Sequence, residues 1–388
     1  MADGNGAAPV GMLAGMSRYV TMTHIRHVQA TKPQGAGGVV GHVYRRVEQD
    51  FGMLAPPIAL HSPAPELIAA SWLVLRESLL VTGALPRITR EAVAAGVSLR
   101  NQCPYCVDVH GSALQGLAPG AGARAVAEGR LDDVADDELR SVTRWAYEGR
   151  PHAPAPAGWS PLQLAEGIAV AVVFEYLNRM VNVFLQPSPL PAGSGRAGRW
   201  VGSRVMGRLA RRAGPPGTDL HLLATAPLPD DLAWVRGRAS IAEAYARAAA
   251  AFERAGQDAV PADVRDLVTE RLTTWARRTE PVTGAECDEA VEWLRPWDRA
   301  AGRLALTAAV SSYRVTDAMV ADFRRGERRD QELVELVGWA AFAAARQAGT
   351  RMAGHSTEAG AGAGDVPGDV AVPGDVARCP VRPEEPAG

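Results

Sequence analysis

The sequence has little excess charge and no long apolar run. Lysine and arginine number 41 against 43 aspartates and glutamates, a formal net charge of −2, and Lys32 is the single lysine. Because a nucleic-acid-binding tail needs a run of one sign, we expect no nucleic-acid partner. The amino terminus lacks a basic stretch followed by an apolar one, and no apolar stretch approaches the roughly 18 residues of a membrane span. We therefore expect a cytoplasmic protein without a membrane partner.

Cysteine is also scarce. The four cysteines lie at positions 103, 106, 287 and 379, in a chain of 388 residues that is 47% hydrophobic. Such a chain can bury a core without disulfides, and a pair three residues apart is too close to be the framework of a small secreted protein. The pair Cys103 and Cys106 therefore indicates redox or metal chemistry. Cys287 and Cys379 have no spacing partner, and we assign them no role.

Apolar residues recur with helical spacing along most of the chain, and strand-like alternation is never long. We therefore predict an all-α protein. Segments rich in glycine and proline separate two groups of expected helices. The predicted division is a lead-in segment over 1–60 with at most one short helix near Val43–Asp50, a helical domain over 61–190, a linker over 191–217, a second helical unit over 218–352 and a disordered tail over 353–388.

The two groups of helices also suggest an internal duplication. A shift of 175 residues places the pattern that begins at Pro86 over a similar one that begins at Pro261. Under the same shift, the residues opposite Cys103, Cys106 and His110 are arginine, proline and alanine. We predict a tandem repeat whose second unit is degenerate and serves as scaffold.

The stretch from Cys103 to His110 reads Cys-Pro-Tyr-Cys-Val-Asp-Val-His. Pro104 suits the first position of a helix, so Cys103 is expected at the N-cap. Cys106 then lies in the first turn, with His110 four residues later on the same face. Two sulfur atoms at a helix start can close a disulfide, and the helix dipole favours thiolate over thiol. This spacing predicts a reversible dithiol.

Two effects compete to decide which cysteine is the nucleophile. The helix dipole favours Cys103, whereas a base one turn away favours Cys106, because His110 can accept its proton. A charge at a helix end contributes about 0.3–1 kcal/mol, less than a well-placed base, so we favour Cys106 and assign Cys103 as its resolving partner. Glu91, on the preceding helix, is expected to hold His110 in the right tautomer and to pass protons onward.

The pattern Glu91-x11-Cys103-x2-Cys106-x3-His110 resembles the signature of the AhpD-like alkylhydroperoxidases in the carboxymuconolactone decarboxylase superfamily. The resemblance extends over about 62–185, with His61 just upstream and Asn178-Arg179 near its end. It implies an all-α AhpD-like helical fold. Asn178 and Arg179 themselves are expected to be structural.

The resemblance also implies a chemistry. In such proteins the second cysteine attacks a hydroperoxide, the first closes a disulfide, and Glu and His relay protons; here these are Cys106, Cys103, Glu91 and His110. It implies no cofactor or metal beyond the Cys103–Cys106 disulfide, and an unidentified dithiol as reductant. Well-studied members carry histidine where this chain has Tyr105, which we expect to line the substrate pocket. Helical repeats with broad apolar faces also favour a homo-oligomer.

Two other interpretations stay open at this point. The first is a lyase of the carboxymuconolactone decarboxylase type on the same helical scaffold, whose members generally lack the cysteine pair. The second is a non-enzymatic module whose cysteines sense oxidants or bind zinc, for which Cys103, Cys106, His110 and Glu91 would be the ligands. Structural zinc sites usually draw their ligands from two separate knuckles, and the sequence has no second Cys/His pair.

Overall fold

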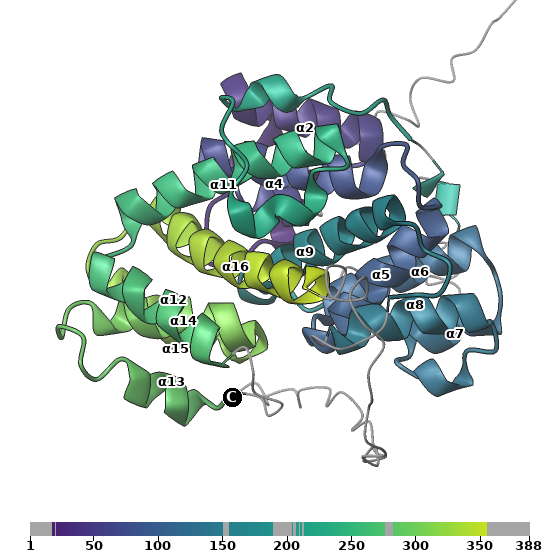
Figure 1. Ribbon diagram of the computed structural model, residues 1–388. Helices are drawn as coiled ribbons and strands as arrows, with labels where there is room; N and C mark the ends of the chain where they lie inside the picture. The colour runs from purple at the N-terminus through teal and green to yellow at the C-terminus, as the bar shows by residue number, and fades with distance from the viewer. Residues whose placement is uncertain are drawn as a thin grey trace, which may run out of the picture.

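The computed structural model describes residues 18–19, 21–149, 155–188, 204, 207–208, 210–211, 213–275 and 282–354. Within these residues the chain is helical, and the only strand-like pairings are two isolated bridges, Ile25 with Leu185 and Val81 with Gly214. The predicted all-α fold is confirmed (Figure 1). The longer helices are α2 (Gly38–Phe51), α4 (Pro65–Leu75), α5 (Arg87–Arg100), α6 (Pro104–Leu117), α7 (Ala121–Ala127), α8 (Asp137–Glu148), α9 (Pro161–Phe184), α11 (Ala239–Ala259), α12 (Ala262–Trp275), α13 (Gly284–Ala290), α14 (Arg299–Ser311), α15 (Asp317–Arg324) and α16 (Asp330–Ala353).

Shorter helical turns complete these elements. One of them, η2 (Arg76–Leu80), is a π-helical turn that continues α4. The other short elements are η1 (Pro33–Gly35), α3 (Pro56–Ala59), η3 (Leu131–Asp133), η4 (Leu220–Leu222), η5 (Asp230–Val235) and η6 (Ser312–Arg314).

The segment before residue 60 is more structured than we expected. Instead of one short helix near Val43–Asp50, the chain forms the 14-residue helix α2 and then α3. Val43, Val47 and Ile58 are fully buried there, because α2 packs its apolar face on α4. The described part of this segment therefore contributes to the core.

Local sequence signals explain two helix starts, of which the one at Cys103 was predicted. Ser160 caps α9: its hydroxyl accepts from the backbone of Gln163, and the Gln163 side chain accepts from the backbone of Ser160. Cys103 is the N-cap of α6, and Pro104 occupies the first helical position. A proline costs nothing there, because the first N–H groups of a helix have no partner within it.

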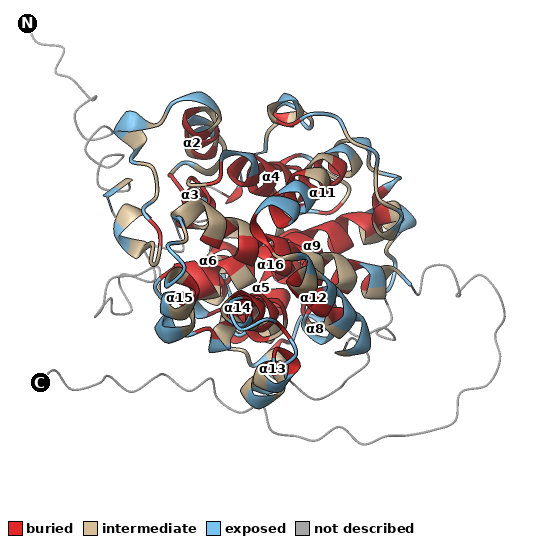
Figure 2. Ribbon diagram, turned by 90° about the vertical axis from the view of Figure 1, so that its left-hand side faces the viewer, coloured by how far each residue is buried: buried red, intermediate tan, exposed pale blue. Residues whose placement is uncertain are grey.

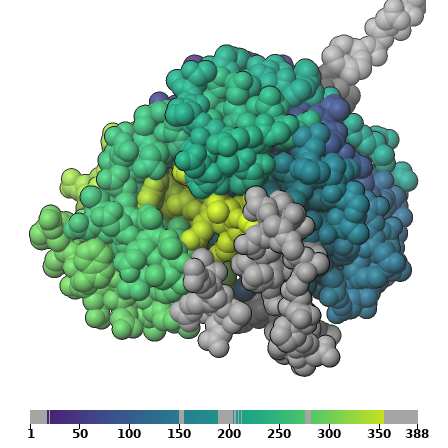
Figure 3. Space-filling model, viewed as in Figure 1, coloured from purple at the N-terminus to yellow at the C-terminus, as the bar shows by residue number. Residues whose placement is uncertain are grey.

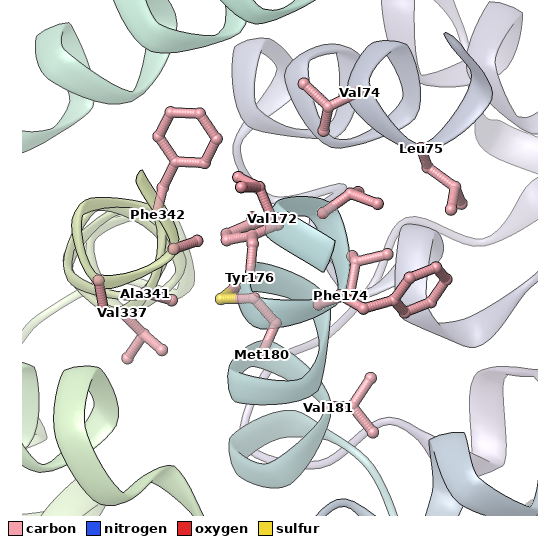
Figure 4. Packing of buried hydrophobic residues seen from close by; sticks show 14 of the residues in the cluster. Val74, Leu75, Val172, Phe174, Tyr176, Met180, Val181, Val337, Ala341 and Phe342 are labelled. Carbon is pink, nitrogen blue, oxygen red and sulfur yellow. The ribbon is translucent and has the colours of Figure 1, made fainter. Parts of the chain in front are cut away.

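The two long helices α9 and α16 pack together at the centre of the molecule, where the burial is highest (Figure 2). Val172 and Tyr176 of α9 face Val337 and Phe342 of α16 (Figure 4). The α16 backbone approaches Val172 closely at Gly349. A Cβ atom added to Gly349 would lie 2.5 Å from the Cγ2 atom of Val172. One cluster of buried apolar residues extends through both halves of the chain.

Helix α9 is also the one helix among the described residues that is long and apolar enough to span a membrane. However, 89% of its most apolar window is buried inside the protein. Glu166 and Glu175 interrupt its apolar sequence, and both are buried and ion-paired, with Arg238 and with Arg100 and Arg179 respectively. A helix that is buried in this way, with its charged residues ion-paired inside the protein, is typical of a protein core.

The order of helices agrees with the predicted duplication, which stays a prediction. Helices α5 and α12 both have 14 residues and directly follow a proline, Pro86 and Pro261. Helices α9 and α16 both have 24 residues. The linker over 191–217 lies mostly outside the described residues, and the tail lies outside them beyond Gly354, Cys379 included.

Candidate active site

Helices α5 and α6 follow each other and pack together (Figure 1). A short connection, in which Gln102 adopts a positive φ of 48°, turns the chain from the end of α5 into α6. Glu91 in the first half of α5 therefore meets His110 in the middle of α6. Both side chains are buried, with 1% and 5% exposure.

Glu91 lies between two basic groups. The Nδ1 atom of His110 is 2.7 Å from Glu91 Oε2, and the Nε atom of Arg87 donates to Glu91 Oε1 at 2.7 Å. Burial alone would raise the pKa of Glu91, but the Arg87 guanidinium and the His110 imidazole outweigh it and lower the pKa to about 2. Glu91 is therefore an ionised carboxylate at neutral pH.

The charge on Glu91 sets the tautomer of His110. An ionised carboxylate can only accept hydrogen bonds, so the Nδ1 atom of His110 must carry the hydrogen that lies between them. In the neutral ring, the lone pair is then on Nε2. Phe174 of α9 holds the ring in place through an edge contact, with ring centroids 4.3 Å apart. His110 is thus oriented as a base.

Cys103 and Cys106 are both free thiols and both buried, with 0% and 4% exposure. Burial raises the pKa of the Cys103 thiol well above its usual range, and a hydrogen bond with the Cys106 side chain adds to this. Cys103 is therefore held as a thiol beside its neighbour. Cys106 and His110 are four residues apart on α6, so they lie on the same face of the helix.

A cavity opens on the carboxylate and the imidazole. It encloses about 290 Å³ of empty space, its open mouth included, and its walls include Arg87, Glu91 and His110. The remaining walls come from α2, η2, α6 and the segment before α11, at Asp50, Phe51, Leu80, Val109, Ala113 and Ala210. Water can therefore reach the Glu91–His110 pair from this side.

Tyr105 is buried between the two cysteines and the amino-terminal segment. Its exposure is 6%, and burial raises the pKa of its phenol. Its ring meets the ring of His24 edge to face, at 6.5 Å between centroids. The residue thus lies near the thiols and is neutral at physiological pH. It is not among the residues that line the cavity at Glu91 and His110, so its place in a substrate pocket stays a prediction.

Other residues singled out in the sequence have structural partners. Asn178 donates to Ser98 Oγ at 3.1 Å, and Arg179 donates to the Ala309 carbonyl at 2.8 Å and pairs with Glu175. Within the described residues, no three His, Cys, Asp or Glu side chains are grouped as a metal ion would require. The cysteine pair with His110 and Glu91 therefore does not form a metal-ligand cluster.

A larger cavity lies in the second half of the chain, on the face shown in Figure 3, where α16 forms the base of a hollow between α11 and α12. It encloses about 1360 Å³, its open mouth included. Its polar walls include the Arg346–Asp231 ion pair, and no cysteine or histidine is among its lining residues. This cavity therefore lacks the thiols and the imidazole that are found at the Glu91–His110 site.

Residues 66–148, which contain Glu91 and the cysteine motif, match the model of the carboxymuconolactone decarboxylase family. The chain is also 35% identical over 331 residues to the alkyl hydroperoxide reductase Rv2159c of Mycobacterium tuberculosis (strain ATCC 25618 / H37Rv). That alignment covers 85% of this chain and 95% of the relative. The chain belongs to the carboxymuconolactone decarboxylase family. The predicted AhpD-like resemblance is thereby confirmed, and the similarity to the relative necessarily extends into the second half.

Two residues of this carboxymuconolactone decarboxylase family site escaped the sequence analysis. Arg87 pairs with Glu91 from four residues away on one helix, a spacing that could have been recognised as an ion pair. Phe174 lies far from the motif in the sequence, and only the packing of α9 on α6 shows that it touches His110. Family membership supports an enzyme with peroxidase-like or decarboxylase-like activity.

Proposed function

We propose that the protein is a thiol-dependent peroxidase that reduces organic hydroperoxides with Cys106 as nucleophile and Cys103 as resolving thiol. The observation that carries this proposal is the buried Glu91–His110 pair, at 2.7 Å, one helical turn from Cys106. The 35% identical relative is named as an alkyl hydroperoxide reductase, which supports the same reaction class.

Proton transfer begins at His110. With Glu91 fixing the hydrogen on Nδ1, the Nε2 atom accepts the Cys106 proton, and the charged ring is stabilised by the carboxylate. Burial keeps the Cys103 thiol protonated, so it does not compete as the attacking thiolate. Cys106 is then the nucleophile.

The reaction conserves atoms and electrons. The Cys106 thiolate attacks the outer peroxide oxygen, the O–O bond breaks, and Cys106 becomes a sulfenic acid while the alkoxide takes the proton from His110 and leaves as the alcohol. The Cys103 thiol then displaces water from the sulfenic acid and forms the disulfide. An external dithiol, oxidised to its own disulfide, restores both thiols.

The first test is a Cys106→Ser variant assayed with tert-butyl hydroperoxide and dithiothreitol. We expect turnover to fall to background, because serine does not form a thiolate equivalent at neutral pH. The matched control is Cys287→Ser, another buried thiol, which should keep wild-type turnover. One equivalent of peroxide should also remove two thiols together in the wild type, and peptide mass mapping should find them joined as Cys103–Cys106.

Wild-type turnover in Cys106→Ser would refute the proposal. A lactone decarboxylation activity that survives the Cys103→Ser/Cys106→Ser double variant would instead identify the protein as a lyase, the activity for which the family is named. Both measurements use the same purified variants, so the two reaction classes are separated directly.

A further inference from the structure

A second cavity adjoins the one that opens on Glu91 and His110. The two share Leu80, Arg87 and Ala210 as walls. The second encloses about 690 Å³, its open mouth included, and is otherwise lined by Pro86, Ile88, Arg90, Leu117, Arg211 and Ala213. We call it the arginine cavity. The shared walls place it directly beside the cavity at the Glu91–His110 pair.

The charged residues that line the arginine cavity are all positive. Arg87, Arg90 and Arg211 line it, and no carboxylate is among its lining residues. The N-terminus of α5 also opens there at Pro86 and Arg87, and no side chain caps it. Free N–H groups at a helix start and the helix dipole both attract anions.

Arg90 is the unusual member of this group. It is only 5% exposed, and its Nη1 atom donates to the Val81 carbonyl at 2.7 Å. Its Nε atom has no hydrogen-bond partner, although the Glu166 and Glu91 carboxylates act on the guanidinium and raise its pKa. Burial, followed by the Arg87 charge, outweighs these carboxylates and lowers the pKa of Arg90 to about 10, so Arg90 remains charged at neutral pH. A buried N–H donor without an acceptor is costly, and an oxygen of an anionic ligand in the cavity would supply that acceptor.

Helix α6 links this cavity to the thiol. Leu117, Ala113, His110 and Cys106 are spaced by four, three and four residues, so they lie on one face of the helix. Leu117 lines the arginine cavity, and Ala113 and His110 line the cavity beside it. Eleven residues separate Leu117 from Cys106, which at a rise of about 1.5 Å per residue is about 16 Å.

We propose that the arginine cavity binds the carboxylate of a long-chain organic hydroperoxide whose chain follows this face of α6 and whose peroxide group reaches Cys106. Leu80, Ile88 and Leu117 supply apolar walls for the chain. With C–C bonds of about 1.5 Å, an extended chain advances about 1.3 Å per bond, so roughly twelve bonds span the distance. The inference rests on the peroxidase reaction proposed above, in which the carboxylate itself is unchanged.

The kinetic test compares linoleic acid 13-hydroperoxide with its methyl ester, with dithiothreitol as reductant. We expect the wild-type kcat/KM to be at least tenfold higher for the acid. In Arg90→Gln and Arg211→Gln this acid-to-ester ratio should fall toward one. Arg208→Gln, on the same segment but not lining the cavity, should keep the wild-type ratio. Because Arg211 is exposed, its variant remains informative if Arg90→Gln does not fold.

The binding test uses probes without a peroxide group, so it does not depend on turnover. By calorimetry, oleate should bind the reduced protein, and both arginine variants should weaken its affinity at least tenfold. Methyl oleate should bind weakly to all three proteins. Arginine-dependent binding of inorganic phosphate without binding of oleate would show a phosphate site and overturn the carboxylate assignment.

The two proposals fail in different ways. If tert-butyl hydroperoxide is reduced but the acid and the ester react equally, the arginine cavity does not select the substrate and the peroxidase proposal stands. If no hydroperoxide is reduced while oleate binding depends on Arg90 and Arg211, the peroxidase proposal fails and the anion site stands. Equal oleate affinity in all variants overturns the anion site.

Discussion

At the scale of single residues, the site depends on one buried carboxylate that serves two partners. Glu91 accepts from Arg87 with one oxygen and from His110 with the other. Neither oxygen is left without a partner, and a buried charge that is fully paired in this way is tolerated inside a protein. The arrangement fixes both the ionisation of Glu91 and the hydrogen position on His110.

Glu91→Gln tests this role. Glutamine keeps the size and one acceptor but removes the charge that stabilises the protonated imidazole, so we expect kcat/KM for tert-butyl hydroperoxide to fall by about 10²-fold. The pH profile of kcat/KM should also change, because the charge that stabilises the protonated imidazole is lost. A profile of unchanged midpoint, with only a lower plateau, would instead indicate a structural role. Asp108→Asn, at an exposed position of α6, is the control and should leave both quantities unchanged.

Glu91→Gln should also change how the free energy of unfolding depends on pH. The folded-state pKa of Glu91, about 2, is below its usual value of 4.5. A depressed carboxyl pKa contributes stability above pH 4.5 that is lost as the pH falls toward 2, because the unfolded chain then binds the proton first. In urea unfolding between pH 5 and 3, Glu91→Gln should therefore lose less stability than the wild type.

At the scale of elements, α5 carries most of the site and is positioned by close packing. Arg87, Arg90 and Glu91 all lie on it, and its other side packs on α8. At Gly96 the contact is so close that an added Cβ atom would lie 2.5 Å from the Thr143 carbonyl oxygen. The lack of a side chain at this one position lets the two helices approach.

Gly96→Val should therefore move α5 and disturb a site that it does not touch. We expect a loss of about 1–3 kcal/mol in the free energy of unfolding, because valine overpacks the contact. We also expect a lower peroxidase rate, since Glu91 shifts relative to His110. The control is Gly284→Ala at the start of α13, where an added Cβ meets nothing within 4 Å. It should be neutral or slightly stabilising in the same urea titration, whereas equal losses in both variants would argue against the packing explanation.

At the scale of the whole molecule, features that depend on neighbouring residues could be predicted from the sequence, whereas contacts between distant segments could not. The N-cap at Cys103 follows from side chains within a few residues and was predicted correctly, and the start of α9 at Ser160 and Pro161 has the same kind of local cause. Glu91 and His110 could be paired because α5 and α6 are consecutive. In contrast, the burial of α2 and the contact of Phe174 with His110 depend on segments far apart in the sequence. Spacing within one segment contains no information about such contacts.

The predicted division of the chain at 191–217 can be tested through this packing. Because α9 of the first half and α16 of the second share one core, the two halves should unfold together. Cys106 and Cys287 lie buried in different halves and serve as reporters. In pulsed alkylation with peptide mass mapping, both thiols should become reactive over the same range of urea concentration. Gly349→Val, which forces α16 away from Val172, should move both transitions to lower urea by the same amount. If Cys287 reacts while Cys106 stays protected, the halves are separate folding units and α16 is not required to hold the site.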